Sequence, residues 1–396
     1  MLGNEYRTAE PVITSVGLSP IGRTELPGRD LFSVALEEAF EGLPAPAEMV
    51  EALYAGNQSE QYEHQIVYGT LLAEWAGLQH IPAERVEGCA AAGALALRHA
   101  VEDVRNGTHG AVLACGVEKM TAGGTGGATD SLSAAFDRAL EQRSGITAPS
   151  QYALLAQRYL HDHDVSEADL ADIAVKNHAN AAQNPRAQYQ TTIDRETVLD
   201  SEYIAPPLKL FDCAPVSDGA AAVLVTTQEI ADELVSRDEQ VHVAGVGVAA
   251  NNIAVAERNL TFIEGANIAT DRAYEQAGIA PADVDIAEVH DAFTVCEALL
   301  AEAAGFAPRG KGVESSLSPT ERSDGWSDVE MSTSGGLKAR GHPIGATGLA
   351  QAVEGYEQLT GRAGDRQIDD AEHALLMNEG GVADAVTVSH VLEGVA

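Results

Sequence analysis

Short apolar runs alternate with amphipathic stretches along the whole chain, which is the pattern of layered α/β proteins. Over residues 89–106 apolar side chains recur every three or four positions, so this segment is predicted to be a helix leading into a buried strand at 111–115. A second unit begins near residue 342 with a glycine-rich loop, continues as a helix, and is followed by strand candidates at 374–377 and 384–391. The repeated order predicts two similarly built α/β halves.

The boundary between these halves is expected near residue 235. A predicted strand at 221–225 and a polar helix close the first half, and a strand at 241–246 opens the second. The N-terminal half is therefore assigned to residues 1–235 and the C-terminal half to residues 236–396.

A long excursion interrupts the first half between about residues 116 and 210. It contains polar amphipathic segments and a glycine-rich stretch at 122–127, which is expected to be flexible. Such an excursion in an α/β protein is typical of a loop domain that covers a substrate site.

Composition limits the partners of this protein. The chain of 396 residues has 60 acidic and 24 basic side chains, a net charge of −36, and a 45% hydrophobic fraction that is too high for a disordered chain. The negative field would repel nucleic acids and anionic membranes, so neither is expected as a partner. The acidic residues are spread over the whole chain and lysine is rare, which favours a halophilic protein over an ordinary acidic mesophilic enzyme.

The cysteine pattern and the N-terminal sequence limit cofactors and location. Four isolated cysteines form no CxxC pair, which argues against a zinc ribbon, an iron–sulfur site or a disulfide framework, and no metal is expected. The first residues lack the basic and apolar pattern of a signal peptide, and no apolar stretch reaches about twenty residues. A cytoplasmic location is therefore expected.

Three polar side chains stand at positions suited to catalysis. His342 lies in the glycine-rich stretch 334–348 before a predicted helix, where it is a candidate base; the alternative is a satisfied histidine at a capped helix entry. His290 follows an apolar strand, where polar residues often face a site. Cys89 lies at the predicted start of a helix, whose dipole would lower the pKa of the thiol; the alternative is a cysteine packed as a small hydrophobe.

Together these positions resemble the thiolase superfamily, and the match covers essentially the whole chain. It looks closest to the sterol-carrier-protein-x type and to archaeal acetyl-CoA acetyltransferases. The stretches that carry the resemblance are 86–98, 116–120, 207–222, 289–294 and 334–348.

The resemblance implies a fold and a set of partners. The expected fold is two similar α/β halves stacked in five layers, with an inserted loop domain, assembled as a homodimer or tetramer. The substrates would be acyl-CoA and CoA, with no other cofactor. Archaeal relatives often work with a small partner that carries an oligonucleotide/oligosaccharide-binding fold and a zinc ribbon, and here that role would fall to a separate chain.

The resemblance also implies roles for particular residues. A cysteine is acylated, His342 acts as its base, and His290 helps to form an oxyanion hole. The substrate-binding positions carried over from the family are Asn378, Gly380, Gly341 and Phe293. Apart from the resemblance, Tyr152 and Met120 in the inserted segment are candidates for lining an acyl pocket; the equally weighted alternative is that both pack in the core.

The register of the nucleophile departs from the family pattern. That pattern places the cysteine three residues before the glycine that corresponds to Gly93, which here is Ala90, so Cys89 stands one residue early. One step along a helix rotates a side chain by about 100° and shifts it by about 1.5 Å. A bulge or an altered first turn would restore the position of the thiol.

The second proton carrier of the family is also replaced. Relatives carry a cysteine or histidine where this chain has Ala292 and Met377, and the nearest substitutes are Glu379 and Cys296. The expected function is an acyl-CoA acetyltransferase or 3-ketoacyl-CoA thiolase acting through an acyl-cysteine. The alternative is a thiolase-fold subunit that binds acyl-CoA or a partner protein without turnover.

Overall fold

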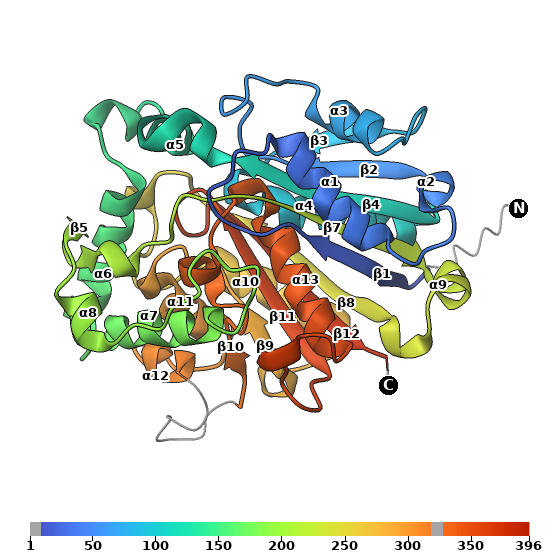
Figure 1. The fold of residues 1–396 in the computed structure, drawn as a ribbon. Helices are drawn as coiled ribbons and strands as arrows, with labels where there is room; N and C mark the ends of the chain where they lie inside the picture. The colour runs from blue at the N-terminus through green and yellow to red at the C-terminus, as the bar shows by residue number, and fades with distance from the viewer. Residues whose placement is uncertain (1–8, 318–327, 396) are drawn as a thin grey trace, which may run out of the picture.

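The computed structural model describes residues 9–317 and 328–395. Its larger sheet is mixed and has ten strands (Figure 1). The strand order is β10-β9-β11-β12-β8-β1-β7-β4-β2-β3. The first half contributes β1 (Pro11–Leu18), β2 (Ala52–Gly56), β3 (Ala83–Val86), β4 (Ala111–Lys119) and β7 (Asp218–Thr227). The second half contributes β8 (Val241–Ala250), β9 (Ile286–Glu288), β10 (Glu330–Met331), β11 (His373–Gly380) and β12 (Val386–Gly394).

The two sets of strands have the same topology. In the first half β4, β2 and β3 pair in parallel, and β7 pairs antiparallel with both β4 and β1. In the second half β11, β9 and β10 pair in parallel, and β12 pairs antiparallel with both β11 and β8. A short antiparallel contact between β1 and β8 joins the two sets. The predicted repeat of two α/β halves is confirmed, whereas the boundary at residue 235 stays a prediction.

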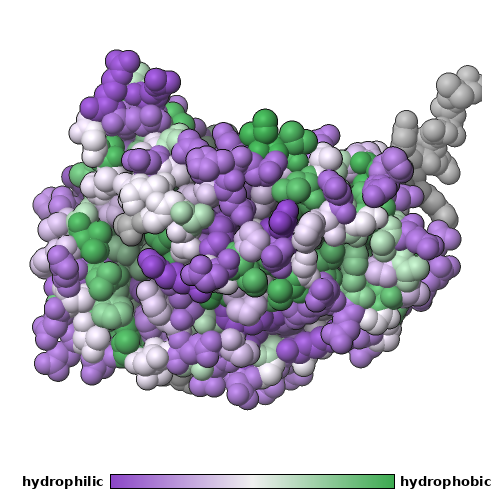
Figure 2. All heavy atoms as spheres, turned by 45° about the horizontal axis from the view of Figure 1, so that its top comes forward, coloured by the Kyte–Doolittle hydropathy of each residue, from purple (hydrophilic) through white to green (hydrophobic). Residues whose placement is uncertain are grey.

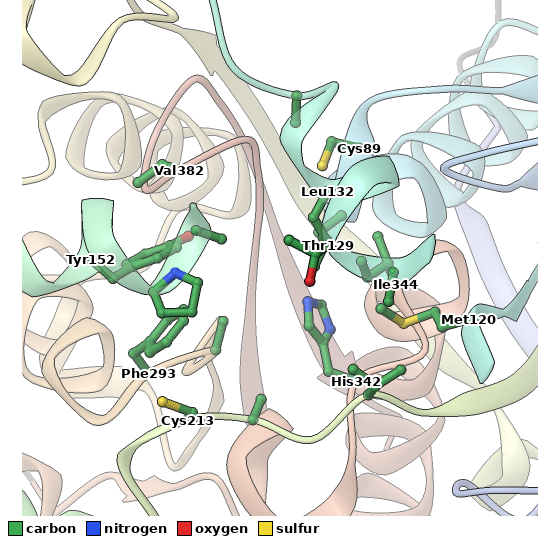
Figure 3. A pocket seen from close by; sticks show the side chains of 18 of the residues that line it. Cys89, Met120, Thr129, Leu132, Tyr152, Cys213, Phe293, His342, Ile344 and Val382 are labelled. Atoms are coloured by element: carbon green, nitrogen blue, oxygen red, sulfur yellow. The ribbon is translucent and has the colours of Figure 1, made fainter. Parts of the chain in front are cut away.

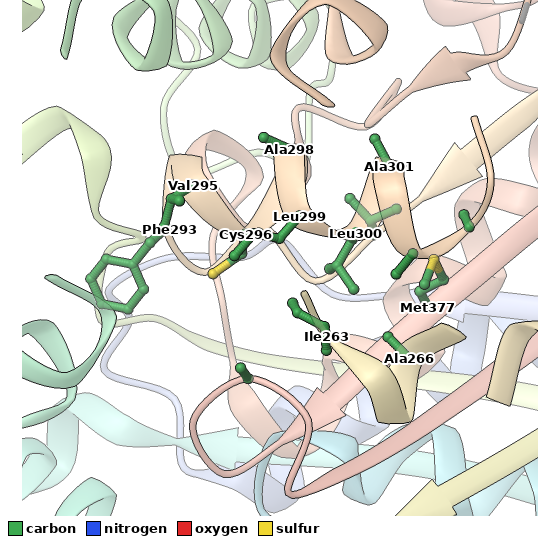
Figure 4. Packing of buried hydrophobic residues seen from close by; sticks show 14 of the residues in the cluster. Ile263, Ala266, Phe293, Val295, Cys296, Ala298, Leu299, Leu300, Ala301 and Met377 are labelled. Carbon is green, nitrogen blue, oxygen red and sulfur yellow. The ribbon is translucent and has the colours of Figure 1, made fainter. Parts of the chain in front are cut away.

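Helices and strands form five layers. Helices α4 (Ala92–Arg105) and α13 (Thr347–Leu359) lie in the middle, and their apolar faces pack against strands of both halves. Helices α1 (Gly28–Phe40) and α3 (Tyr68–Trp75) cover the outer face of the first half. Helices α10 (Glu264–Ala277) and α11 (Thr294–Ala303) cover the outer face of the second half, where Figure 4 shows the packing of α11 against β11.

The two central helices begin side by side because glycines allow their backbones to meet. A Cβ at Gly93 would lie 2.8 Å from the carbonyl oxygen of Gly345, and a Cβ at Gly348 would lie 2.4 Å from the backbone nitrogen of Ala94. Any larger residue at these positions would push the helix starts apart. The close approach brings the segment before α4, which carries Cys89, next to the segment before α13, which carries His342.

The inserted segment is more regular than expected. It contains α5 (Gly124–Ser133), α6 (Ala148–Asp162), α7 (Glu167–Ala181), α8 (Arg195–Leu199) and the hairpin strands β5 (Tyr203–Ala205) and β6 (Leu208–Lys209). Four residues of the glycine-rich stretch 122–127 begin α5, and the expected flexibility of this stretch stays a prediction. Each glycine costs a helix about 1 kcal/mol; Ala128 of α5 is 1% exposed and packs in a small cluster with Met120 and Ile344. The remaining short helices are α2 (Pro46–Met49), α9 (Gln228–Leu234) and α12 (Gly312–Ser316).

The surface carries fewer lysine side chains than the low lysine content of the sequence alone would suggest, because most of the lysines are buried. Of five lysines in the chain, Lys119, Lys176, Lys209 and Lys338 are buried, and Lys311 is exposed. The face in Figure 2 is mostly hydrophilic, with hydrophobic groups scattered between. Across residues 9–317 and 328–395, the structure has no helix long and apolar enough to cross a membrane.

Candidate active site

A cavity of about 440 Å³ lies where the segments before α4 and α13 meet the inserted segment. Four of the seven predicted site residues line it: Cys89, His290, Phe293 and His342. Cys89 and His342 lie on one side of this space, and Phe293 lies on the opposite side (Figure 3). The structure therefore brings together side chains that are up to 253 positions apart in the chain (342 − 89 = 253).

Cys89 is held in a backbone conformation that is rare for a residue with a side chain. Its φ is +53°, in the left-handed region, and it begins the short 3₁₀ turn Cys89–Ala91 that leads into α4. Such strain is retained where surrounding structure enforces it and is frequent at active sites. This turn places both Cys89 and Ala90 on the cavity wall, so the sequence offset does not remove the thiol from the site.

The thiol of Cys89 is not preformed as a thiolate. Burial raises its pKa to about 11, the backbone N–H groups of Gly381 and Ala90 oppose this increase, and the nearby carboxyls of Glu87 and Glu118 add to it. The expectation that the helix dipole lowers this pKa is wrong, because the cost of desolvating the anion exceeds the benefit of the dipole. Cys89 is therefore protonated near neutral pH and needs a base.

His342 has the protonation state of a base. Its Nδ1 lies 2.7 Å from the hydroxyl of Thr347, and that hydroxyl donates to the carbonyl of Pro343 at 3.1 Å. The Thr347 oxygen is thus left to accept from Nδ1–H, which leaves the lone pair on Nε2. Burial, followed by the charge of Arg340, lowers the pKa of His342 to about 3, so the ring is neutral at physiological pH.

His290 has the complementary tautomer. Asn378 donates from Nδ2 to Nδ1 of His290 over 3.0 Å, so the ring hydrogen resides on Nε2. The rings of His290 and His342 meet edge to face with centroids 5.0 Å apart. Burial and the neighbouring His342 hold the pKa of His290 well below its usual range. The site thus combines one neutral imidazole that accepts a proton with another that donates a hydrogen bond.

Two buried carboxyls hold the loop that carries His342, and sequence reasoning assigned no role to either. Asp291 accepts from the backbone N–H of Leu337 at 2.6 Å, at the start of this loop. Glu118 accepts from the backbone N–H of Gly345 at 3.0 Å and from that of Gln58 at 2.7 Å. Burial raises the pKa of Glu118 to about 8 despite these donors. The only sequence signal for a role of Glu118 is its place in the stretch 116–120, which is one of the stretches that carry the family resemblance.

The other predicted residues lie outside the cavity lining. Asn378 contacts His290, and Gly380 approaches the carbonyl of Gly88, from which a Cβ would be only 2.0 Å away. Gly341 has a φ of +111°, which the turn before His342 requires, and contributes no lining atom. Their assignment as substrate-binding residues stays a prediction.

Neither substitute for the second proton carrier lines the cavity. Cys296 is completely buried in α11 among apolar side chains, in the same cluster as Phe293 and Met377, and it lies at the Phe293 end of the helix (Figure 4). Glu379 is completely buried, and its carboxyl oxygens have no hydrogen-bond partner. Burial, followed by the charge of Asp384, raises the pKa of Glu379 well above its usual range, and Arg258 opposes this shift.

Comparison with known proteins identifies the family. Residues 11–229 match the thiolase N-terminal domain, and residues 245–393 match the thiolase C-terminal domain-like family. The chain belongs to the thiolase family, and it is an enzyme of the acyltransferase class. The predicted resemblance is confirmed, and the alternative of a subunit without turnover is not favoured.

Particular relatives support this assignment. The chain is 39% identical to an acetyl-CoA acetyltransferase of Methanothermobacter thermautotrophicus, over 91% of this chain and 93% of that protein. It is 33% identical to the benzoylsuccinyl-CoA thiolase subunit BbsB of Thauera aromatica, over 90% and 91% of the two chains. A solved structure, the Ltp2-ChsH2(DUF35) aldolase, has the same fold with a TM-score of 0.81 at 21% identity, covering 98% of this chain and 99% of that one.

In the described part of the chain, His, Cys, Asp and Glu side chains form no group of three or more that is placed to hold a metal ion. The four cysteines are all free thiols. The expectation that the substrates are CoA thioesters fits the family, and the absence of a metal stays a prediction.

Proposed function

We propose that this enzyme exchanges acyl groups between CoA thioesters through an acyl intermediate on Cys89. It acts as an acetyl-CoA acetyltransferase in condensation and as a 3-ketoacyl-CoA thiolase in thiolysis. The observation that carries the proposal is the pair of neutral imidazoles that line one cavity with the partly buried Cys89 thiol, one with a lone pair on Nε2 and one with Nε2–H. This pair supplies a base and an oxyanion donor at one site.

The acylation step follows from these protonation states. Nε2 of His342 takes the proton of the Cys89 thiol as the sulfur attacks the reacting carbonyl carbon, which is C1 of acetyl-CoA in condensation and the ketone carbon C3 of the 3-oxoacyl group in thiolysis. Nε2–H of His290 stabilises the negative charge that develops on the carbonyl oxygen, and such a donor is worth about 3 kcal/mol in the transition state. When the tetrahedral intermediate collapses in thiolysis, the C2–C3 bond of the 3-oxoacyl group breaks, the acyl group stays on sulfur, and the enolate of acetyl-CoA leaves and takes up at C2 the proton that His342 removed from Cys89. The thiol of free CoA then gives its proton to His342 and attacks the acyl-cysteine. Acyl-CoA is released, and the Cys89 thiolate takes the proton back from His342, which restores the free enzyme.

The test is thiolysis of acetoacetyl-CoA by CoA in molar potassium chloride, followed by the disappearance of the 3-oxoacyl thioester. We expect turnover by the wild type. An enzyme that binds CoA but consumes no thioester, in either direction and at any salt concentration, would contradict the proposal and restore the subunit without turnover.

Replacing Asn378 tests the proposed role of His290. In Asn378→Ala the ring of His290 loses the donor that holds its hydrogen on Nε2. We expect kcat to fall about ten- to hundredfold, with little change in KM. Asn378→Asp is the matched variant, because a carboxylate accepts from Nδ1–H and selects the opposite tautomer. If Asn378→Asp retained full activity, the tautomer argument would be wrong.

The proposal includes an assembly. We infer a homodimer or tetramer, together with a separate small partner that carries an oligonucleotide/oligosaccharide-binding fold and a zinc ribbon. Two names support a partner: the BbsB relative is named as a subunit, and the fold neighbour is named as a complex with a DUF35 chain. Purification of the endogenous protein in high salt tests this inference, because recovery of homo-oligomers alone would count against the partner.

We also propose that the protein works in the salt-rich cytoplasm of a halophile. The net charge of −36 and the burial of four of the five lysines leave the surface acidic. At about 1 M salt the Debye length is only about 3 Å, so repulsion between surface carboxylates is screened. The four free thiols suit a reducing compartment.

Thermal unfolding checks this inference. We expect the unfolding midpoint to rise by about 5 °C or more between 0.1 M and 2 M potassium chloride, as self-repulsion in the folded state is removed. Sucrose at matched osmolality is the control, because it stabilises proteins without screening charge. A midpoint that is highest in dilute buffer would identify an ordinary acidic enzyme.

The division into residues 1–235 and 236–396 remains part of the proposal. The first domain match ends at residue 229 and the second begins at residue 245, so the proposed boundary lies in the segment that connects them. The repeated strand order supports the same division.

A further inference from the structure

The cavity beside Cys89 is larger than a two-carbon acyl group needs. Its volume of about 440 Å³ is room for roughly fifteen groups of the size of water, at about 30 Å³ each. An acetyl or acetoacetyl group would leave most of this space unfilled. Apolar space without an occupant forfeits packing contacts, so the size of the cavity itself points to a larger ligand.

The walls away from the reacting groups are hydrocarbon. On one side Tyr152 and Phe293 stack, with ring centroids 4.3 Å apart and an angle of 27° between the rings. On the other side lie Leu132, Met120 and Ile344 (Figure 3). The pantetheine arm of CoA carries amides that need hydrogen-bond partners, and a wall of this kind offers few. The space therefore suits the apolar part of an acyl chain.

Small side chains from several elements create this space. Five alanines face the cavity. They are Ala128 in α5, Ala135 in the turn after it, Ala148 in the first turn of α6, Ala214 in the loop before β7 and Ala292 in the segment before α11. A larger apolar residue at any one of them would fill part of the volume. The cavity is thus a property of side-chain choice as well as of the fold.

Hydrogen bonds fix the position of the Tyr152 ring relative to the Cys89 thiol. The hydroxyl of Tyr152 accepts from the backbone N–H of Ala383 at 3.0 Å and donates to the carbonyl of Gly381 at 3.4 Å. The backbone N–H of Gly381 in turn faces the sulfur of Cys89. A chain bonded to that sulfur would extend along a wall whose position relative to the thiol is fixed.

We propose that the preferred acyl group is large and apolar: the substrate is a 3-oxoacyl-CoA whose acyl chain reaches the Tyr152–Phe293 pair. This inference rests on the proposed acyl transfer through Cys89 and names its substrate class. Each methylene that leaves water on binding contributes about a fourfold gain in affinity, equivalent to about 0.8 kcal/mol. Selectivity over acetoacetyl-CoA therefore grows with chain length until the cavity is full.

The first experiment compares kcat/KM for thiolysis of acetoacetyl-CoA, 3-oxohexanoyl-CoA, 3-oxooctanoyl-CoA and 3-oxo-3-phenylpropanoyl-CoA. We expect kcat/KM for 3-oxooctanoyl-CoA or for 3-oxo-3-phenylpropanoyl-CoA to exceed that for acetoacetyl-CoA at least tenfold. The ratio of kcat/KM between the eight-carbon and the phenyl substrate shows whether the cavity prefers an alkyl chain or a ring. A preference for acetoacetyl-CoA would overturn the inference and leave the proposed function intact. Failure of all four substrates would overturn the proposed function instead.

The second experiment is independent of turnover and measures binding of octanoyl-CoA and acetyl-CoA by calorimetry in a Cys89→Ala background. Ala135→Phe and Ala148→Phe, on two different elements, should each reduce the preference for octanoyl-CoA at least tenfold. The matched control is Ala134→Phe, because Ala134 is exposed, adjacent in sequence and outside the cavity lining, so it should leave the preference unchanged. Equal binding of the two thioesters by the parent protein, or an equal effect of Ala134→Phe and Ala135→Phe, would overturn the inference.

Discussion

Thiolysis by Cys89→Ala is expected to fall by at least about a thousandfold, to the background of the assay, while the protein stays folded. Removing the sulfur removes the atom that carries the acyl group, and no other side chain replaces a nucleophile in a covalent mechanism. A stability change is not expected to explain the loss, because the β-carbon remains and only one atom is removed from a cavity wall. The measurement is kcat with acetoacetyl-CoA and CoA, accompanied by the unfolding midpoint of both proteins.

Ala90→Cys in the Cys89→Ala background is the matched control. It moves the thiol to the position that the family pattern predicts, and both residues line the cavity. If the strained turn at Cys89 supplies the geometry, this double variant remains inactive, because a displacement of about 1 Å can cost a hundredfold in rate. Full activity of the double variant would refute the argument that the strained turn is required, and full activity of Cys89→Ala itself would refute the assignment of Cys89.

The layered fold was predictable because its signals are local and repeated. Helical spacing at 89–106 and the strand at 111–115 correspond to α4 and β4, and the glycine-rich loop at 342 leads into α13 as expected. The start of α5 within the glycine-rich stretch 122–127 was not predicted, because glycine disfavours a helix in the isolated chain. Packing of α5 over the cavity depends on residues that are distant in sequence, and no local pattern reveals it.

The identity of the candidate site residues was predictable, whereas their protonation states were not. Motifs place Cys89, His290 and His342 near helix starts or strand ends. The pKa of Cys89 depends on burial by residues from the whole fold, and this effect reverses the expected influence of the helix dipole. In the same way, the bond from Gly345 to Glu118 joins positions 227 residues apart, so only the folded chain shows that Glu118 holds the His342 loop.

His342 offers the second large effect and a pH profile that separates its role from a structural one. In His342→Ala we expect kcat to fall by roughly 10²–10⁴, the usual contribution of a positioned base. Because burial lowers the pKa of His342 to about 3, the neutral ring is the working form. Lowering the pH protonates and inactivates it only as the pH approaches about 3, well below the usual value near 6.5.

Wild-type kcat/KM should therefore stay level between about pH 5 and pH 7, where an ordinary histidine base would produce a limb. Thr347→Val is the matched variant, because it removes the oxygen that accepts from Nδ1–H and keeps the ring in place. Without that acceptor the hydrogen is free to move to Nε2, so kcat should fall about tenfold while KM changes little. A limb near pH 6.5 in the wild type would show that His342 is solvated in the working enzyme, and full activity of His342→Ala would show that the proton of Cys89 leaves by another route.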